Sequence, residues 1–230
     1  MQFILVLLFT LFMLTGCKER HVISGSDGWG FSASLDSEVI TDVKVDDLSI
    51  RKVRRKSDTC VSGYIEHLEI HGSIGKDSTT AIGIILPQLE GCRDAKGTRI
   101  VNSVYMSSGG GSLSDGFKLG RLFRANSTNT YVTGGQTCSS SCAIAFLGGD
   151  FRSMNGDGKL MYHAPYISGN FGVGIDCSDR GQVSELRNYY TEMLGEKTGM
   201  FLLDRTMQYC SSKDGWTINA DAAEIFGILR

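Results

Sequence analysis

The chain has little proline, little net charge and no apolar run long enough to be an obvious membrane span. It contains 2 prolines among 230 residues, and 41% of its residues are hydrophobic. That composition supplies one sizeable core rather than two full domains. The formal net charge of -2 at pH 7 excludes a general attraction to nucleic acid, so we expect no nucleic-acid partner.

Two polar clusters fit the surface of β-strands better than a binding site. The basic run RKVRRK, residues 51–56, has acidic residues around it, and we expect a solvated strand face. His67, Glu69 and His71 would share one face of a strand over residues 64–71, as a site with two histidines and one carboxylate requires. No further ligand lies nearby in the sequence, and we expect no metal there.

The longest apolar segment runs from Phe3 to Leu14, too short to cross a bilayer comfortably and of the length of a signal-peptide core. It ends in LTGC, residues 14–17, which resembles the lipobox of bacterial lipoproteins. The resemblance implies that Cys17 is lipidated and that residues 1–17 form a signal peptide. An uncleaved N-terminal anchor is the alternative. Either way we expect an exported protein held at a membrane on the periplasmic side of the bacterial envelope. Lys18 is similar to the outer-membrane sorting pattern.

Export changes the interpretation of the cysteines, because disulfides form in oxidising compartments. Apart from Cys17 there are six: Cys60, Cys92, Cys138, Cys142, Cys177 and Cys210. Six cysteines allow 15 pairings, and the sequence does not choose among them. Cys138 and Cys142 could bridge locally. The spacings do not form the paired CxxC knuckles of a zinc site, so we expect disulfides or buried thiols, with no metal and no cofactor.

The chain is organised around TGGQTCSSSCAIAF, residues 133–146. This segment predicts a strand end, a Gly-Gly turn, a turn of small residues and the start of an apolar helix. Its three consecutive serines lie where a strand passes into a helix, a place where backbone N–H groups are free to bind an anion. A serine nucleophile of acyl transfer fits this position if a base and oxyanion donors are also present. A cluster of helix-capping serines is the structural alternative.

The preceding segments alternate between strands and helices. We expect a helix near residues 78–91, a strand over residues 99–106, a glycine turn SSGGGSL over residues 107–113, a helix over residues 114–125 and a strand over residues 130–134. Glycines let backbone amides approach a ligand closely. Such alternation favours an α/β fold with right-handed crossovers, in which loops gather on one side.

The three segments SSGGGSL, GGQTCSSSCAIAF and KLMYHAP, residues 107–113, 134–146 and 159–165, together resemble the Clp-type serine peptidase family of the ClpP/crotonase-like superfamily. Exported bacterial Clp-like proteins with a C-x-S-x-C turn are more similar still, because a Gly-Gly-x-x-Arg element follows that turn, here at residues 148–152. The resemblance implies a repeated ββα superhelix with C-terminal helices. It covers roughly residues 64–230.

By this resemblance the nucleophile is Ser140, with Ser139 and Ser141 as alternatives in the same run. His163 is the implied general base, since it ends an apolar strand just before a loop. An imidazole can accept a serine proton near neutral pH and return it to the leaving group. A histidine packed in the core is the structural alternative.

The implied acid of the triad is Asp214, which stands two residues before an aromatic residue as in the family. A carboxylate there would hold the imidazole tautomer and stabilise the imidazolium. Three other residues compete for this role: Asp176, Asp179 and Asp204. The implied oxyanion donors are the backbone amides of Gly111 and Ser141. The chain has Gly109 where the family loop has proline.

The C-terminal part predicts two helices, over residues 180–194 and 200–209. In Clp-like proteins this region contributes to subunit contacts, which implies a possible homo-oligomer. We therefore expect a tether and N-terminal strand region over residues 18–58 and a hydrolase domain over residues 59–230. The expected function is ATP-independent cleavage of acyl bonds, most simply peptide bonds in a protein or peptide substrate. A non-catalytic binding or assembly module with the same fold is the alternative.

Overall fold

The computed structural model describes residues 36–165, 183–210 and 214–230. The lipobox and the glycine- and serine-rich tether lie outside these residues, as do Asp176, Cys177 and Asp179. Lipidation of Cys17 and the signal peptide therefore stay predictions. The domain boundary at residue 58 also stays a prediction. Among the described residues, no helix has the length and apolar character needed to cross a membrane.

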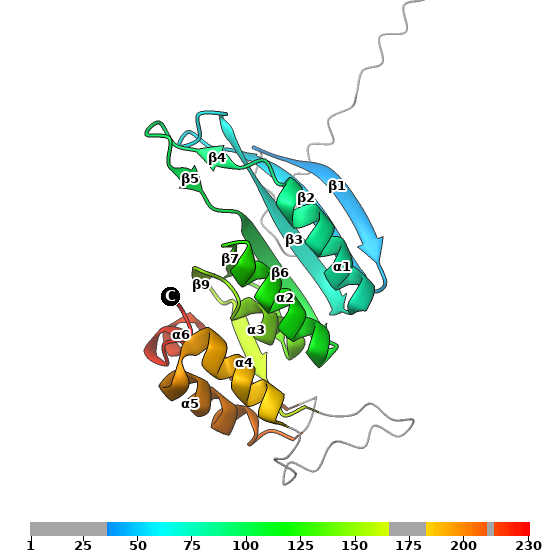
Figure 1. The fold of residues 1–230 in the computed structure, drawn as a ribbon, viewed down its shortest axis with the longest axis vertical. Coiled ribbons are helices and arrows are strands. Elements are labelled where there is room, and N and C mark those ends of the chain that lie inside the picture. Colours follow the sequence, from blue (N-terminus) through cyan, green and yellow to red (C-terminus); the bar gives the residue numbers. More distant parts are fainter. Residues whose placement is uncertain (1–35, 166–182, 211–213) are drawn as a thin grey trace, which may run out of the picture.

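The protein alternates strands and helices along most of its length (Figure 1). In chain order the elements are β1 (Ser37–Val45), β2 (Leu48–Lys56), β3 (Tyr64–Ile74), α1 (Lys76–Ile85), the 3-10 turn η1 (Leu86–Gln88), β4 (Cys92–Arg93), β5 (Arg99–Ile100), β6 (Ser103–Gly111), α2 (Leu113–Ala125), β7 (Asn129–Val132), β8 (Thr137–Ser139), α3 (Ser141–Phe146), β9 (Arg152–Met154), β10 (Lys159–Tyr162), α4 (Ser184–Leu194), α5 (Glu196–Thr206), β11 (Trp216–Ile218) and α6 (Ala220–Ile225).

The main sheet has nine strands and branches at β6. The path β1-β2-β3-β6-β8-β10-β11 is continuous, and β7 pairs with both β6 and β9. The β6 strand pairs with β7 through residues 103–105 and with β8 only at Ser108. The pairs β3-β6, β6-β7, β6-β8 and β8-β10 are parallel, so the strands that carry the serine turn and the histidine end at the same edge. Figure 1 shows α1, α2 and α3 across one face of this sheet.

The antiparallel β1-β2 hairpin lies in the N-terminal strand region expected over residues 18–58. It turns at Asp46, which has a φ of 54°, a left-handed conformation that aspartate tolerates better than most residues. The β2 strand then pairs with β3 over its full length. Alternate residues of β2, Leu48 and Ile50, are buried in the core, so one face of the hairpin is part of the main hydrophobic cluster.

The α2 helix confirms the helix expected over residues 114–125. Ser112 caps it, because its hydroxyl accepts a hydrogen bond from the amide of Asp115 at 3.4 Å. Its apolar residues Phe117, Leu119 and Phe123 are buried. The helix packs against α3, the helix that follows the serine turn, and against β6.

Four local expectations were wrong in detail. The first helix ends at Ile85 and tightens into η1, because Pro87 cannot continue the hydrogen-bond ladder. The strand over residues 99–106 is interrupted after Ile100, and its second part continues through the expected glycine turn to Gly111. Glycine has no side chain to prevent this extended pairing. The last long helix spans Glu196–Thr206, because Gly195, at a φ of 79°, ends α4 and starts α5.

The basic run of β2 is not a uniformly solvated face. The Lys52 Nζ lies 2.7 Å from one carboxylate oxygen of Glu66, and the Arg54 Nη2 lies 2.8 Å from the other. The Glu66 side chain is 0% exposed, and it also accepts a hydrogen bond of 2.7 Å from the amide of Glu90. This buried carboxylate therefore ties β2, β3 and the segment after η1 together.

Burial alone would raise the pKa of the Glu66 carboxyl, but hydrogen bonds from Lys52, the Glu90 amide and Arg54 outweigh burial and hold the pKa below its ordinary value. The native state therefore binds this proton less readily than the unfolded chain. The stabilisation is fully present above the unfolded-state pKa of about 4.3 and is lost as the pH falls through the lowered native value.

We predict that Glu66→Gln lowers the free energy of unfolding by about 3 kcal/mol at pH 7, because two cations lose their buried partner. Asp42→Asn is the matched control: Asp42 pairs with Arg51 at 2.9 Å but is half exposed, and its loss should cost less than about 1 kcal/mol. Urea denaturation at pH 7 and pH 4 measures both. Equal effects of the two changes, or an acid sensitivity that Glu66→Gln leaves intact, would contradict the assignment.

Candidate active site

The serine turn joins β8 to α3 through Ser140, which has a φ of 53° and a ψ of -123°. A positive φ is uncommon for a residue other than glycine and costs of the order of 1–3 kcal/mol. The backbone on both sides holds it in place: its amide donates to the Met161 carbonyl at 2.8 Å, and its carbonyl accepts from the Ile144 amide at 3.0 Å. Strained residues of this kind gather at functional sites.

A disulfide between Cys138 and Cys142 spans the same turn, with the Cα atoms 5.2 Å apart. It confirms the local bridge that the sequence left as one possibility. Cys138 lies in β8 and Cys142 in the first turn of α3, and both are 0% exposed. The bond therefore fixes the angle between β8 and α3 at Ser140, the residue that joins these two elements.

Burial distinguishes the three serines. Ser139 is 6% exposed and Ser141 is 0% exposed, whereas Ser140 is only half buried. The hydroxyl of Ser141 has no hydrogen-bond partner among the described residues, so it is an enclosed side chain rather than an accessible one. Of the three, Ser140 presents the hydroxyl that a substrate could reach.

His163 lies beside the serine turn on the neighbouring strand. In the parallel pair β8-β10, Ser139 is opposite Met161, so His163, two residues further, follows the same edge of the sheet as Ser140. The imidazole is 8% exposed, and its Nδ1 lies 2.8 Å from the carbonyl oxygen of Ala164. A carbonyl can only accept, so this bond places a proton on Nδ1, and in the neutral ring the lone pair is then on Nε2.

Ser140 and His163 lie at the same edge of the sheet without a hydrogen bond between their described side chains. Ser140 and His163 share no hydrogen bond in the structure as described. Catalytic hydrogen bonds are often longer in the absence of substrate. The arrangement therefore has the two groups at neighbouring strand ends, with the imidazole in the tautomer that a general base needs.

Asp214 precedes β11, the strand that pairs with the strand before His163. The β11 strand is antiparallel to β10, with Trp216 opposite Tyr162. Asp214 lies two residues before the first residue of β11, outside the paired strand. The Asp214 side chain is exposed and makes no hydrogen bond or ion pair with another described residue. Its competitor Asp204, on α5, is also exposed, so the assignment of the acid stays a prediction.

The glycine strand end lies against Ser140. A Cβ added to Gly110, which has a φ of 108°, would stand 2.7 Å from the Cβ of Ser140, while one added to Gly109 would meet nothing within 4 Å. The amide of Ser112 donates to the Ile74 carbonyl of β3 at 2.9 Å. Gly111, the last residue of β6, therefore lies beside both β3 and the residue that packs against Ser140.

The second expected donor, the amide of Ser141, is at the first position of α3. Amides at a helix start have no partner within the helix. The two expected donors, Gly111 and Ser141, thus come from the two chain segments that flank Ser140, which is the placement that an oxyanion site requires.

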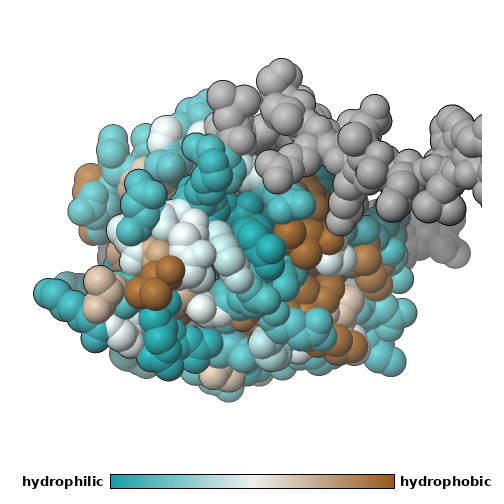
Figure 2. Space-filling view, turned by 90° about the horizontal axis from the view of Figure 1, so that it is seen from above, coloured by the Kyte–Doolittle hydropathy of each residue, from teal (hydrophilic) through white to brown (hydrophobic). Residues whose placement is uncertain are grey.

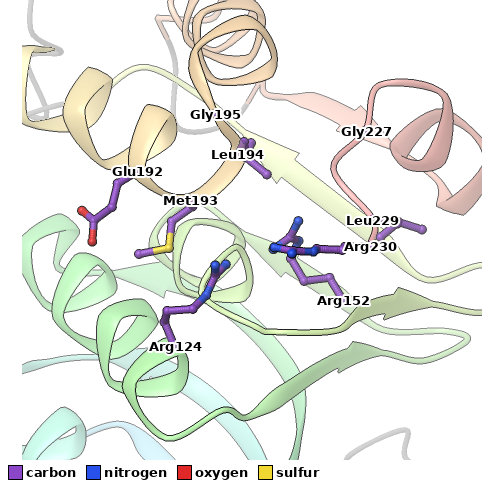
Figure 3. A pocket seen from close by; sticks show the side chains of 9 residues that line it. All are labelled: Arg124, Arg152, Glu192, Met193, Leu194, Gly195, Gly227, Leu229 and Arg230. Carbon is purple, nitrogen blue, oxygen red and sulfur yellow. The ribbon is translucent and has the colours of Figure 1, made fainter.

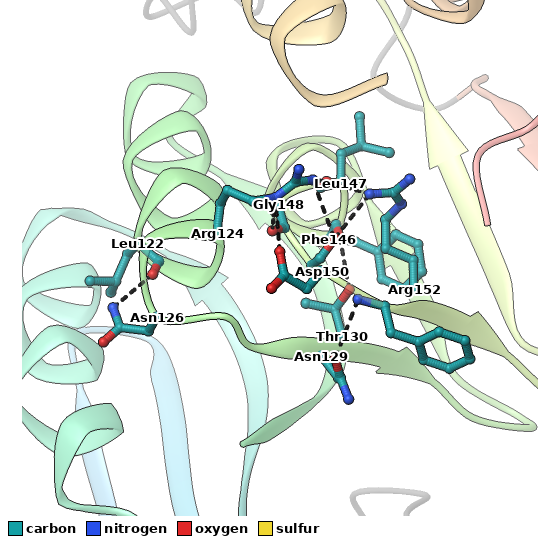
Figure 4. Close-up of polar contacts among 12 residues, drawn as sticks. Leu122, Arg124, Asn126, Asn129, Thr130, Phe146, Leu147, Gly148, Asp150 and Arg152 are labelled. Atoms are coloured by element: carbon teal, nitrogen blue, oxygen red, sulfur yellow. Dashed lines mark hydrogen bonds and ion pairs between the residues drawn. The ribbon is translucent and has the colours of Figure 1, made fainter. Parts of the chain in front are cut away.

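The sequence indicated Arg152 only as part of the Gly-Gly-x-x-Arg element, and it gave no role to Arg124. Arg152 donates to the carbonyls of Leu147, Gly149 and Ile228 at 3.2, 2.9 and 2.7 Å. Arg124 donates to the carbonyl of Gly148 at 3.0 Å. Figure 4 shows both side chains converging on the end of α3. The preference of arginine for carbonyls at helix C-termini was the signal that could have identified them.

The remaining cysteines complete the covalent framework. Cys60 and Cys92 form a disulfide with their Cα atoms 5.5 Å apart, which links the β2-β3 connection to β4. Cys210 is also disulfide-bonded. The sequence alone did not choose any of these pairings, because it does not show which loops meet.

No family model matches the chain, and no curated protein matches it. Among solved structures it is similar to a ClpP1 mutant from Listeria monocytogenes, with a TM-score of 0.51 and 16% sequence identity over 71% of this chain and 88% of that chain. The likeness shows that the protein has a ClpP-like α/β fold, which confirms the expected class of fold. At this identity it shows the fold alone.

We predict that Gly110→Ala lowers the free energy of unfolding by about 2 kcal/mol or more, because the new methyl group would need a left-handed backbone and would collide with Ser140. Gly109→Ala is the matched control and should change stability by less than about 1 kcal/mol. Chemical denaturation of the two variants decides the point. A stable Gly110→Ala protein would show that the glycine strand does not press on the serine turn.

Proposed function

We propose that this protein is a Clp-like serine hydrolase, acting on peptide bonds, with Ser140 as nucleophile and His163 as general base. The observation that carries the proposal is the pairing of one accessible serine, at a strained turn, with a histidine that follows the same sheet edge and has its lone pair on Nε2. The ClpP-like fold supports it. This constellation is the one that acyl transfer by serine needs.

In the proposed reaction, Nε2 of His163 takes the proton from the Ser140 hydroxyl as the oxygen attacks the carbonyl carbon of the substrate. The amides of Gly111 and Ser141 would stabilise the negative oxygen of the tetrahedral intermediate. The imidazolium then gives its proton to the leaving amine, and the acyl-enzyme forms. Water repeats the same proton transfers to release the acid and restore Ser140.

The finer expectations belong to the same proposal. The C-x-S-x-C turn, now a closed disulfide, supports a place among exported Clp-like proteins, where the repeated ββα superhelix is the expected architecture. A lipid-anchored protein at the bacterial envelope, with Cys17 as the anchor, would meet protein or peptide substrates without ATP. The protein would form a homo-oligomer through its C-terminal helices, as Clp-like proteins do.

A non-catalytic binding module is the second candidate. The exposed Asp214, which does not bond to His163 in the described structure, favours it, because the third member of a triad normally holds the imidazole. Reactivity of the serine separates the two candidates, because an unactivated serine does not react with an electrophilic phosphonate at an appreciable rate.

We predict that a fluorophosphonate probe labels the full chain once and that Ser140→Ala abolishes the label. Ser141→Ala is the matched control. It removes a buried hydroxyl that makes no hydrogen bond with a described residue, so both the labelling and the stability should be unchanged. His163→Ala should slow labelling by about 100-fold or more. Mass spectrometry of the intact protein and of its peptides gives the site. Absence of labelling in a folded parent would refute the hydrolase and leave the binding module.

The acid is tested separately. We predict that Asp214→Asn slows labelling by about tenfold or more, because the imidazolium loses its countercharge, while Asp204→Asn leaves the rate unchanged. Both residues are exposed, so neither change should unfold the protein. If neither change alters the rate of labelling, the acid of the triad is another carboxylate.

A further inference from the structure

A pocket lies at the opposite end of α3 from Ser140. It has a volume of about 380 Å³ and opens between the end of α4, β9 and the C-terminal residues. Three arginines line it, Arg124, Arg152 and Arg230, and Figure 3 shows their side chains entering the same space from different elements. Met193 and Leu229 add apolar surface. The size is within the range of small-molecule sites.

The buried cation of this pocket is Arg152, which is 3% exposed. Its Nε and Nη1 donate to backbone carbonyls. Its Nη2 makes no hydrogen bond with another described residue and is not fully enclosed, so it is open to the pocket that Arg152 lines. Carbonyl oxygens satisfy hydrogen bonds but do not neutralise a guanidinium.

The side-chain charges around the pocket do not balance. Burial, together with repulsion from Arg124 and Arg230, lowers the pKa of Arg152 to about 10. At neutral pH the guanidinium stays charged. The carboxylate side chain among the lining residues, Glu192, is already paired with Arg121 at 2.8 Å.

Arg124 is the only one of the three with a nearby carboxylate among the described side chains, Asp150 at 3.5 Å. Asp150 is 43% exposed, so solvent screens this pair. The side chains of the pocket thus hold more positive charge than the neighbouring carboxylate side chains offset.

We propose that this pocket binds a phosphate group, held by the Nη2 of Arg152 and by Arg124 and Arg230. A phosphate carries close to two negative charges at pH 7 and several acceptor oxygens, and the planar guanidinium fork matches its geometry. The pocket is larger than a free phosphate ion, so a small phosphomonoester fits the remaining space against Met193 and Leu229. The site is independent of the hydrolase proposal, because it shares no residue with it.

We predict that the full chain in a non-ionic detergent binds inorganic phosphate and glycerol 3-phosphate by titration calorimetry, and that each raises its Tm. Mass action requires such a rise for any ligand that binds only the native state. Tighter binding of the ester would identify a phosphomonoester as the ligand, and tighter binding of the inorganic ion would identify free phosphate. Acetate, a monoanion, should bind about tenfold more weakly than either.

Arg230→Gln should weaken phosphate binding by about tenfold or more, because it removes one charge-assisted donor. Arg230 is exposed, so the fold should persist, and the Tm without ligand checks this. Arg187→Gln is the charge-matched control: Arg187 is exposed on α4 and does not line the pocket. Glu192→Gln should strengthen binding, because it removes negative charge.

Three outcomes would overturn the proposal: no phosphate binding by the parent, equal binding by Arg230→Gln and Arg187→Gln, or acetate binding as tight as phosphate.

Discussion

The structure depends on how the short helix α3 is held at both ends. At its start, Ser140 occupies a strained backbone conformation, whose cost of about 1–3 kcal/mol must be offset elsewhere. The Cys138–Cys142 disulfide and the hydrogen bond from Ser140 to Met161 offset it locally. At its end, Arg124 and Arg152 bind the carbonyls that the helix leaves unpaired. A helix of two turns has little stability of its own, so these contacts decide its position and therefore that of the serine.

Close packing against α2 supplies the rest of this constraint. A Cβ on Gly116 would stand 2.7 Å from the Ser141 carbonyl oxygen, and one on Gly148 would collide with the Gly120 carbonyl oxygen. The helices can approach this far only because these positions lack side chains. The approach also encloses the hydroxyl of Ser141. Helix packing thus explains the different burial of Ser140 and Ser141: the same contact that buries Ser141 leaves Ser140 between the helix and the glycine end of β6.

Local patterns predicted the parts of the molecule that depend on nearby residues. The local pattern of residues 114–125 indicated α2, and the spacing of Cys138 and Cys142 allowed the bridge across the turn. The course of β6 through Gly111 could not be predicted, because glycine suits a turn equally well and only the pairing with Ile74 extends the strand. The Cys60–Cys92 disulfide and the contact of Arg152 with Ile228, 76 residues away, depend on which distant segments meet, which one sequence does not show.

The imidazole of His163 also explains why the acid was the least predictable member of the site. In a triad the carboxylate has two tasks, to fix the tautomer and to stabilise the imidazolium. Here the Ala164 carbonyl already fixes the tautomer in the resting state, at 2.8 Å from Nδ1. A carbonyl dipole offers less stabilisation to a full positive charge than a carboxylate does. A carboxylate near His163 would therefore matter mainly once the ring is protonated, and the resting structure places no strong demand on its position. An exposed Asp214, two residues before β11, is compatible with that division of tasks.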